Sequence, residues 1–274
     1  MLPGTLLALR EGIEASLIIS LVLGSLHILT HNRLKRFVWL GAATALLLSM
    51  LAAAGLFLAR TAFGGKSEAA FEGASMLFSA AMLTWMILWV RKHVSANTAS
   101  LHSHIEHTLA ENAHTERSIF LLSFLAVLRE GLELAIFLFT ASLTSGFSQT
   151  LVGAGLGLAG AVIAGSLFYS GATRLNLSLF FKLTGTLLIL FAAGLVGQGL
   201  HEFVDAGFIS GIIRPVWDTN RLISQTSPAG SLLKSLFGYN SRPSLIESIT
   251  YFLYFGLLVL IARPKPFPQK QPRA

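Results

Sequence analysis

Long apolar runs dominate the chain, and short polar stretches separate them. Seven of these runs are long enough to cross a lipid bilayer as a helix, which takes about 20 residues. They cover approximately residues 4–29, 37–59, 69–90, 118–143, 150–171, 179–200 and 247–262. The pattern therefore predicts an all-α integral membrane protein with seven transmembrane helices.

Two of the apolar runs contain the same charged motif. Residues 10–14 read Arg-Glu-Gly-Ile-Glu, and residues 129–133 read Arg-Glu-Gly-Leu-Glu. The two glutamates of each copy are three residues apart and share a helix face. Each arginine lies four residues before the second glutamate of its copy and can neutralise it. Each glycine removes a side chain beside the carboxylates, so another backbone or an ion can come close. The six charged residues are Arg10, Glu11, Glu14, Arg129, Glu130 and Glu133.

The doubled motif predicts an internal repeat. Residues 1–90 and 118–200 would be its two copies, each with three membrane crossings. Because three is odd, the second copy enters the membrane from the opposite side, which makes the two copies inverted repeats. Transporters built from such repeats often hold their substrate at the repeat interface near the middle of the membrane. We therefore expect the two motif helices to run antiparallel and to face each other there.

The remaining residues divide into connecting segments and a last helix. Residues 91–117 would form an inner loop rich in His and Glu, and residues 201–246 an outer loop with short interfacial helices. Residues 247–262 would be the seventh transmembrane helix. The basic, proline-rich tail of residues 263–274 is expected to be disordered near anionic lipid.

Further acidic and histidine side chains lie near the ends of the predicted helices. Two acids open the third apolar run, and a histidine and an acid follow the sixth, where they could concentrate cations in an outer vestibule or simply face the membrane interface. These residues are Glu68, Glu72, His201 and Asp205. In the inner loop, three residues share one helix face and could accept a metal, although their irregular spacing favours a solvated linker. These residues are His104, His107 and Glu111.

Composition and charge agree with a membrane protein. The 274 residues are 53% hydrophobic and 12% charged, with a mean hydropathy of +0.68, whereas soluble domains are about 25% charged. The net charge of +7 arises mostly between and after the apolar runs, so it indicates topology and lipid headgroups rather than nucleic acid. If the N-terminus lies outside, twelve of the Lys and Arg residues between and after the apolar runs lie inside and six lie outside. Because cytoplasmic loops carry an excess of Lys and Arg, this count favours that orientation and a cytoplasmic C-terminus.

The charged motifs need a partner, because a charge within a membrane helix costs roughly a few kcal/mol or more. Salt bridges could merely lock two helices together, but each arginine faces two carboxylates, and a bound cation would balance the excess negative charge. Carboxylates without thiolates select hard cations, namely iron, manganese, magnesium or calcium, and the chain has no cysteine. Protons could also be carried. A di-metal oxidase would use Glu-x-x-His pairs, which these helices lack, and a structural subunit of an uptake complex is a further alternative.

The two motifs resemble the paired Arg-Glu-Gly-x-Glu motifs of the oxidase-dependent iron permease family, which includes fungal high-affinity iron permeases and a bacterial ferrous-iron permease branch. Other stretches, which together span nearly the whole chain in order, are similar to the bacterial branch. They are Phe71-Glu72-Gly73, Leu83-Thr84-Trp85-Met86, Arg174-Leu175-Asn176-Leu177, Phe180-Phe181-Lys182, Ala192-Ala193-Gly194-Leu195 and Phe237-Gly238-Tyr239. At one position the branch reads His-Glu-Ala-Gly and this chain reads Val204-Asp205-Ala206-Gly207, so the acid remains, the histidine is lost, and His201 could replace it.

The resemblance implies a high-affinity permease that moves iron inward, a transporter and not an enzyme. Iron, as Fe(II) or Fe(III), would be the substrate, with no bound organic cofactor. The four motif glutamates would be the iron-pathway carboxylates, structured by the two arginines, with Glu72 as the acid that begins the third helix. The resemblance further implies seven helices with the N-terminus outside, a bacterial inner membrane, and a ferroxidase or a periplasmic iron-delivery protein as partner. The sequence is also compatible with a homo-oligomer.

Overall fold

The computed structural model describes residues 1–28, 32–93, 115–170, 177–208, 216–220, 222–224, 227, 230, 233–234 and 238–262. Within these residues the chain forms seven α-helices, one short 3-10 helix and no strand. The α-helices are α1 (Leu2–Ile28), α2 (Lys35–Ala62), α3 (Lys66–His93), α5 (Thr115–Ser145), α6 (Phe147–Tyr169), α7 (Leu177–Asp205) and α9 (Leu245–Ala262). The 3-10 helix η1 (Asn32–Leu34) leads into α2. The prediction of an all-α fold is confirmed.

The helices follow the predicted apolar runs and end at recognisable breaks. The turn between α2 and α3 contains Gly65 with a φ of +58°, and α5 and α6 meet at Gly146 with a φ of +87°. Both values lie in a backbone region that favours glycine over residues with a side chain. These two glycines therefore let the chain reverse direction between long helices.

Four of the described helices, α2, α3, α6 and α7, are long and apolar enough to cross a membrane. The motif helices α1 and α5 are of similar length, with 27 and 31 residues, but each carries three motif charges in its apolar stretch. The last helix, α9, has 18 residues. This all-helical, apolar chain is consistent with an integral membrane protein, and the total of seven spans stays a prediction.

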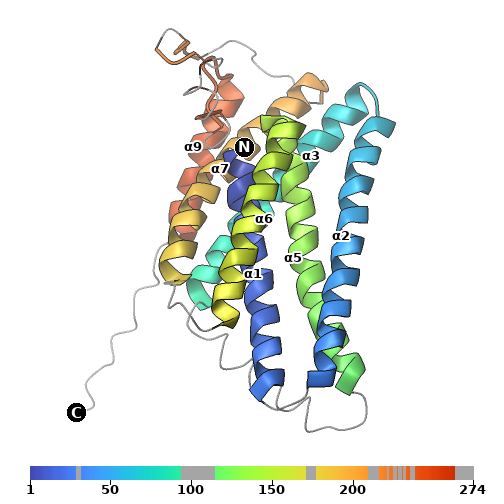
Figure 1. Cartoon of the computed structure of the whole chain (residues 1–274). Coiled ribbons are helices and arrows are strands. Elements are labelled where there is room, and N and C mark those ends of the chain that lie inside the picture. Colours follow the sequence, from blue (N-terminus) through green and yellow to red (C-terminus); the bar gives the residue numbers. More distant parts are fainter. Residues whose placement is uncertain are drawn as a thin grey trace, which may run out of the picture.

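The helices form one bundle in which neighbours in the sequence run in opposite directions (Figure 1). Helix α1 packs mainly against α6, α5 against α2, and α3 against α7, while α1 and α5 also touch each other. The N-terminus, the end of α7 and the start of α9 lie at one end of the bundle, which we call the N-terminal end, and we call the opposite end the far end.

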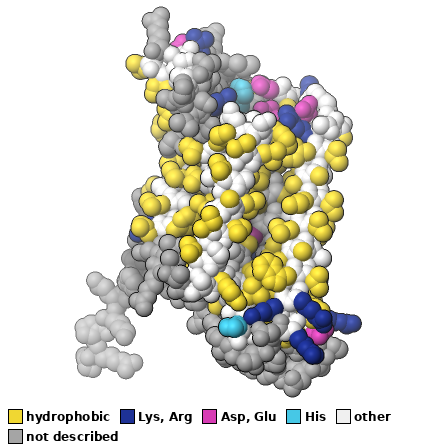
Figure 2. Space-filling model, in the orientation of Figure 1, with side chains coloured by type: hydrophobic (Ala, Val, Ile, Leu, Met, Phe, Trp, Pro, Cys, Tyr) yellow, Lys and Arg dark blue, Asp and Glu magenta, His cyan; other side chains and the backbone are white. Residues whose placement is uncertain are grey.

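The surface separates into an apolar belt and two polar ends. Apolar side chains cover the middle of the face shown in Figure 2, and charged and histidine side chains gather at both ends. Many large side chains of the belt are well exposed, among them Leu51 of α2, Val162 of α6 and Phe252 of α9. Such a belt suits contact with lipid tails rather than with water.

Close packing of α1 on α6 depends on small residues. Gly157 of α6 is buried, and a Cβ added to it would lie 2.7 Å from the backbone nitrogen of Leu9 and 2.9 Å from the Cβ of Ala8. Real Cβ atoms do not come this close to backbone, so any side chain at this position would push the two helices apart. Gly155, on another face of α6, has nothing near its added Cβ.

We expect Gly157→Ala to destabilise the protein and Gly155→Ala to leave it unchanged or slightly more stable. The first change overpacks the α1–α6 contact, with a loss of about 1–3 kcal/mol, whereas the second adds a good helix former in open space. Thermal unfolding of the purified protein in detergent measures both. Equal unfolding temperatures for the two variants would contradict the packing described here.

Candidate functional site

The two charged motifs meet where α1 and α5 lie against each other. Glu11, Glu14 and Glu130 each offer a carboxylate oxygen, and these three oxygens lie within 4.8 Å of one another. A hard cation takes its oxygen ligands at about 2.0–2.6 Å, so ligands on opposite sides of one ion are about 4–5 Å apart. One cation could therefore touch all three carboxylates. We call these three residues and Glu133 the carboxylate cluster.

Each arginine pairs with the glutamate four residues after it, as the spacing predicts. The Nε of Arg10 lies 3.3 Å from the carboxylate of Glu14. The Nε of Arg129 lies 3.0 Å from the carboxylate of Glu133, to which it donates a hydrogen bond, and 3.9 Å from that of Glu130. The two positive charges thus hold part of the negative charge of the cluster, and Glu11 has no close arginine among the described ion pairs.

Several atoms of the cluster are buried without a hydrogen-bond partner among the described residues. They include both carboxylate oxygens of Glu11 and one oxygen each of Glu14, Glu130 and Glu133. A buried polar group left unsatisfied costs about 1–3 kcal/mol, and more when it is charged. If the cluster served only to lock two helices together, hydrogen bonds to these oxygens would make the protein more stable. These oxygens, of which the one on Glu14 lies 3.3 Å from the Nε of Arg10, match the ligands that a hard cation prefers.

The two motif glycines bring neighbouring helices close to the cluster. A Cβ on Gly12 would lie 2.6 Å from the Cβ of Ala161 on α6, and a Cβ on Gly131 would collide with the Ser49 side chain on α2. The group that approaches each motif glycine is therefore a side chain of a neighbouring helix. The first motif thus packs against α6 and the second against α2, and each of these is the second helix of the other predicted repeat. This contact fixes the position of the carboxylates along the bundle axis.

The predicted vestibule acids of α3 lie at the N-terminal end and share one basic partner. The Nε of Arg60, near the end of α2, is 2.5 Å from the carboxylate of Glu72 and 3.6 Å from that of Glu68. Sequence reasoning counted Arg60 among the six basic residues outside and missed this pairing. The signal was present, since a turn of a few residues must place the end of α2 beside the start of α3.

The other vestibule residues lie at the end of α7, where α9 begins. His201 approaches Asp205 at 3.5 Å through Nε2 and Glu247 at 3.0 Å through Nδ1. Asn240 donates a hydrogen bond of 2.9 Å to the second carboxylate oxygen of Glu247. Sequence reasoning missed Glu247, although an acid in the first turn of the last helix was a visible signal.

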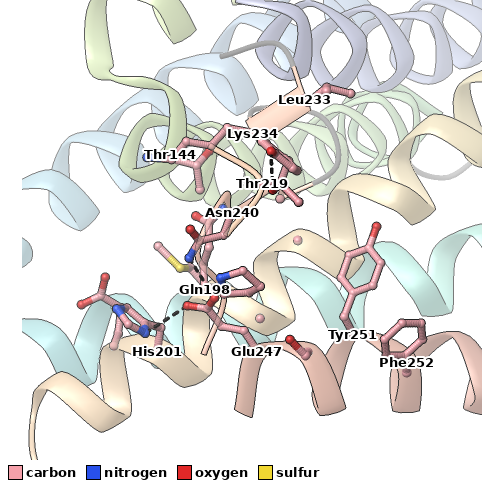
Figure 3. A pocket seen from close by; sticks show the side chains of 18 of the residues that line it. Thr144, Gln198, His201, Thr219, Leu233, Lys234, Asn240, Glu247, Tyr251 and Phe252 are labelled. Carbon is pink, nitrogen blue, oxygen red and sulfur yellow. Dashed lines mark hydrogen bonds and ion pairs between the residues drawn. The ribbon is translucent and has the colours of Figure 1, made fainter. Parts of the chain in front are cut away.

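A cavity of about 590 Å³ opens beside these groups, between α7, α9 and the described part of the segment that joins them. Figure 3 shows His201 and Glu247 facing each other at its polar side, with Tyr251 and Phe252 of α9 nearby. Gln198 and Glu202 of α7 also line it. Of the four predicted vestibule residues, His201 alone lines the cavity, and Glu68, Glu72 and Asp205 are not among the lining residues.

The predicted inner acceptor lies outside the described residues. His104, His107 and Glu111 belong to the stretch 94–114, and the predicted tail, residues 263–274, is also not described.

Comparison with known proteins shows which protein family this chain matches. The model of the Iron permease FTR1 family matches residues 1–264. A protein of Escherichia coli O6:K15:H31 called ferrous iron permease EfeU is 35% identical over 272 residues, which cover 95% of both chains. Proteins with the same name from Shigella sonnei and Yersinia pestis are 36% and 32% identical, over 94% and 95% of this chain and 94% and 93% of their own. No solved structure matches. The chain belongs to the iron permease FTR1 family.

Proposed function

We propose that this protein is an iron permease that carries iron through the carboxylate cluster. The observation that carries the proposal is the set of three carboxylate oxygens, from α1 and α5, that lie within 4.8 Å of one another inside the bundle. Family membership supports iron as the substrate, and the relatives named above are called ferrous iron permeases. Oxygen ligands of this kind suit Fe(II) and Fe(III) alike.

We further propose seven membrane spans arranged as two inverted repeats, residues 1–90 and 118–200, followed by the last helix. The packing supports this relation, because exchanging the repeats maps the α1–α6 contact onto the α5–α2 contact. The α3–α7 and α1–α5 contacts map onto themselves under the same exchange. The cluster then lies on the pseudo-two-fold axis, where transporters with inverted repeats hold their substrates.

In this proposal iron enters at the N-terminal end, which faces the outside of a bacterial inner membrane. Glu72, Asp205 and Glu68 collect the cation by their negative potential, and His201 lies beside Asp205 as a further candidate ligand. The ion then reaches the carboxylate cluster and leaves at the far end, towards the cytoplasmic loop of residues 91–117. A ferroxidase or a periplasmic iron-delivery protein would supply the iron.

The two arginines would prepare the cluster for a cation. Four carboxylates without counter-charges would repel one another strongly in a medium of low dielectric constant. Arg10 and Arg129 reduce this repulsion in the empty site while each still leaves carboxylate oxygens uncovered. When iron binds, its charge replaces theirs, so the arginines are free to move away from the carboxylates.

Two other functions fit the site less well. A di-metal oxidase would use histidine ligands beside the carboxylates, and the metal-binding group found among the described residues contains glutamates alone. A structural subunit would not require unsatisfied carboxylates in its interior. A transporter for another hard cation, such as manganese, uses the same ligands and is separated by competition.

Iron uptake into proteoliposomes that contain this chain alone tests the proposal. We expect uptake in the wild type and its loss in Glu14→Gln and Glu133→Gln, because each change removes a charge from the cluster while keeping its shape. Glu116→Gln is the matched control, since Glu116 lies on α5 but is exposed at its far end, 4.0 Å from Arg36. Full uptake by both cluster variants would refute the site.

The form of iron is varied in the same assay. Fe(II) kept reduced with ascorbate is compared with Fe(III)-citrate. Uptake of Fe(II) alone would identify a self-sufficient ferrous permease. If neither form enters, the chain needs a partner that delivers or oxidises the iron.

Metal competition separates iron from manganese. We expect a moderate excess of unlabelled iron to suppress the uptake of labelled iron, and the same excess of manganese, magnesium or calcium to leave most of it. Equal suppression by manganese would favour a general transporter of hard divalent cations.

The arginine pairs predict unequal effects on stability. Arg10 is buried, so Arg10→Gln leaves uncompensated buried charge and should lower the free energy of unfolding by about 3–5 kcal/mol. Arg129 is half-exposed, and Arg129→Gln should lower it by less, because less buried packing is lost with this side chain, although Glu133 then loses its close cation. Thermal or denaturant unfolding in detergent compares them. Adding Glu14→Gln to Arg10→Gln should restore part of the loss, and equal losses for both arginines would contradict the burial difference.

A further inference from the structure

The carboxylate cluster is shielded unequally on its two sides. Helices α1 and α5 run in opposite directions, so Arg10 and Glu133 lie towards the N-terminal end, and Glu14 and Arg129 lie towards the far end (Figure 1). The side chains of Arg10 and Glu133 are 1% and 6% exposed, whereas those of Glu14 and Arg129 are 19% and 52% exposed. Exposure therefore rises from the N-terminal side of the cluster to the far side in both motifs.

Within the described chain, the N-terminal side of the cluster is thus the more closed one. Figure 2 shows a small acidic patch among the apolar side chains of the belt, between the two polar ends.

An apolar layer closes the N-terminal side. Leu7 lies one helical turn before Glu11, and Phe137 lies one turn after Glu133, so both point along the faces that carry the carboxylates. Both side chains are fully buried and belong to one apolar cluster with Met76 of α3 and Leu195 of α7. We call these four residues, which come from four helices, the apolar layer; the cluster itself continues along α3 and α7 through residues such as Leu83 and Leu188.

This layer separates the carboxylates from the cavity at the N-terminal end. Met76 belongs to the layer and also lines the cavity, and Leu143 packs on the layer and lines the cavity too. Leu143 lies ten residues beyond Glu133, which is about 15 Å along a helix. A cation beside Leu143 is thus about 15 Å along the helix from the carboxylates, and the buried side chains of the apolar layer lie between them.

The far side carries smaller residues at the corresponding positions. In the proposed repeat relation, the position one turn before the motif holds Leu7 in the first copy and Ala126 in the second. The position one turn after it holds Ile18 in the first copy and Phe137 in the second. Leu7 and Phe137 are fully buried, whereas Ala126 and Ile18 are partly exposed. A leucine and a phenylalanine thus close one side, where an alanine and an isoleucine stand on the other.

We propose that Leu7 and Phe137 form a gate between the N-terminal cavity and the carboxylate cluster, and that this structure holds the gate closed with the cluster accessible from the far half. This inference rests on the proposed function, because a gate matters to a protein that passes an ion. Apolar constrictions stop ions by excluding the water that must accompany them. Opening requires Leu7 and Phe137 to separate, which a relative movement of α1 and α5 would achieve.

Cysteine labelling tests the gate without iron, since the natural chain has no cysteine. Glu14→Cys places a thiol in the carboxylate cluster, and Thr144→Cys places one in the N-terminal cavity. A charged, membrane-impermeant thiol reagent is added to right-side-out and to inverted membrane vesicles. We expect the thiol at position 14 to react from the side opposite to the one that labels position 144.

Opening the gate should remove this sidedness. Adding Phe137→Ala or Leu7→Ala should speed labelling of position 14 from the cavity side at least about tenfold, because each removes much of the apolar seal. Phe139→Ala is the matched control. Phe139 is on the same helix and equally buried, but its ring packs on Phe57 and Phe71 rather than in the apolar layer. It should leave labelling one-sided.

The outcomes separate the gate from the transport function. Labelling of position 14 equally from both sides with the gate residues intact would refute a closed gate, and so would gate variants that fold, by size-exclusion chromatography, yet keep position 14 shielded. Should one gate variant fail to fold, the other tests the same seal from the opposite helix. One-sided labelling together with full iron uptake by both Glu14→Gln and Glu133→Gln would retain the gate and overturn the proposed function.

Discussion

The arrangement depends on one electrostatic constraint, which is that four carboxylates share the interior of an apolar bundle with two guanidinium groups. Such a group of charges persists only where the surrounding helices hold it in position. Gly12 and Gly131 supply that support, because they let α6 and α2 pack directly against the motif helices beside the charges. The resulting pairs, α1 with α6 and α5 with α2, then determine how α3, α7 and α9 can surround the centre.

The partial neutralisation of the four glutamates by the two arginines is as important as the burial of the glutamates. A cluster fully paired with arginines would bind a cation weakly, and one without arginines would repel itself and resist folding. Here the described contacts join each guanidinium to a glutamate of its own helix and leave both oxygens of Glu11 without a hydrogen-bond partner. In the proposed function, this arrangement lets the site keep its shape when empty and leaves carboxylate oxygens available to a cation, which suits reversible binding.

Much of the fold and of the candidate site could be predicted from the sequence. The remainder depends on contacts between helices, which local sequence patterns do not encode. Helices, their approximate limits and the pairing of each Arg with the Glu four residues later follow from local periodicity, which acts within one helix. The roles of Arg60 and Glu247 depend on contacts between helix ends, which no single-helix pattern encodes. Likewise, the spacing of Glu11 and Glu14 gives their shared face, but not that Arg10 is buried while its counterpart Arg129 is half-exposed. That difference arises from how two equivalent units settle against each other.

The last helix adds to the difference between the two ends of the bundle. Within the proposed repeats the two sides already differ, since Leu7 corresponds to Ala126 and Phe137 to Ile18. Helix α9 packs on α7 and, with the described part of the segment before it, builds a cavity bearing Glu202, His201 and Glu247 at one end. In the proposed function, this cavity gives the N-terminal end an acidic mouth to which the far end of the described chain has no counterpart from the last helix, so an arriving cation meets negative charge first at that end.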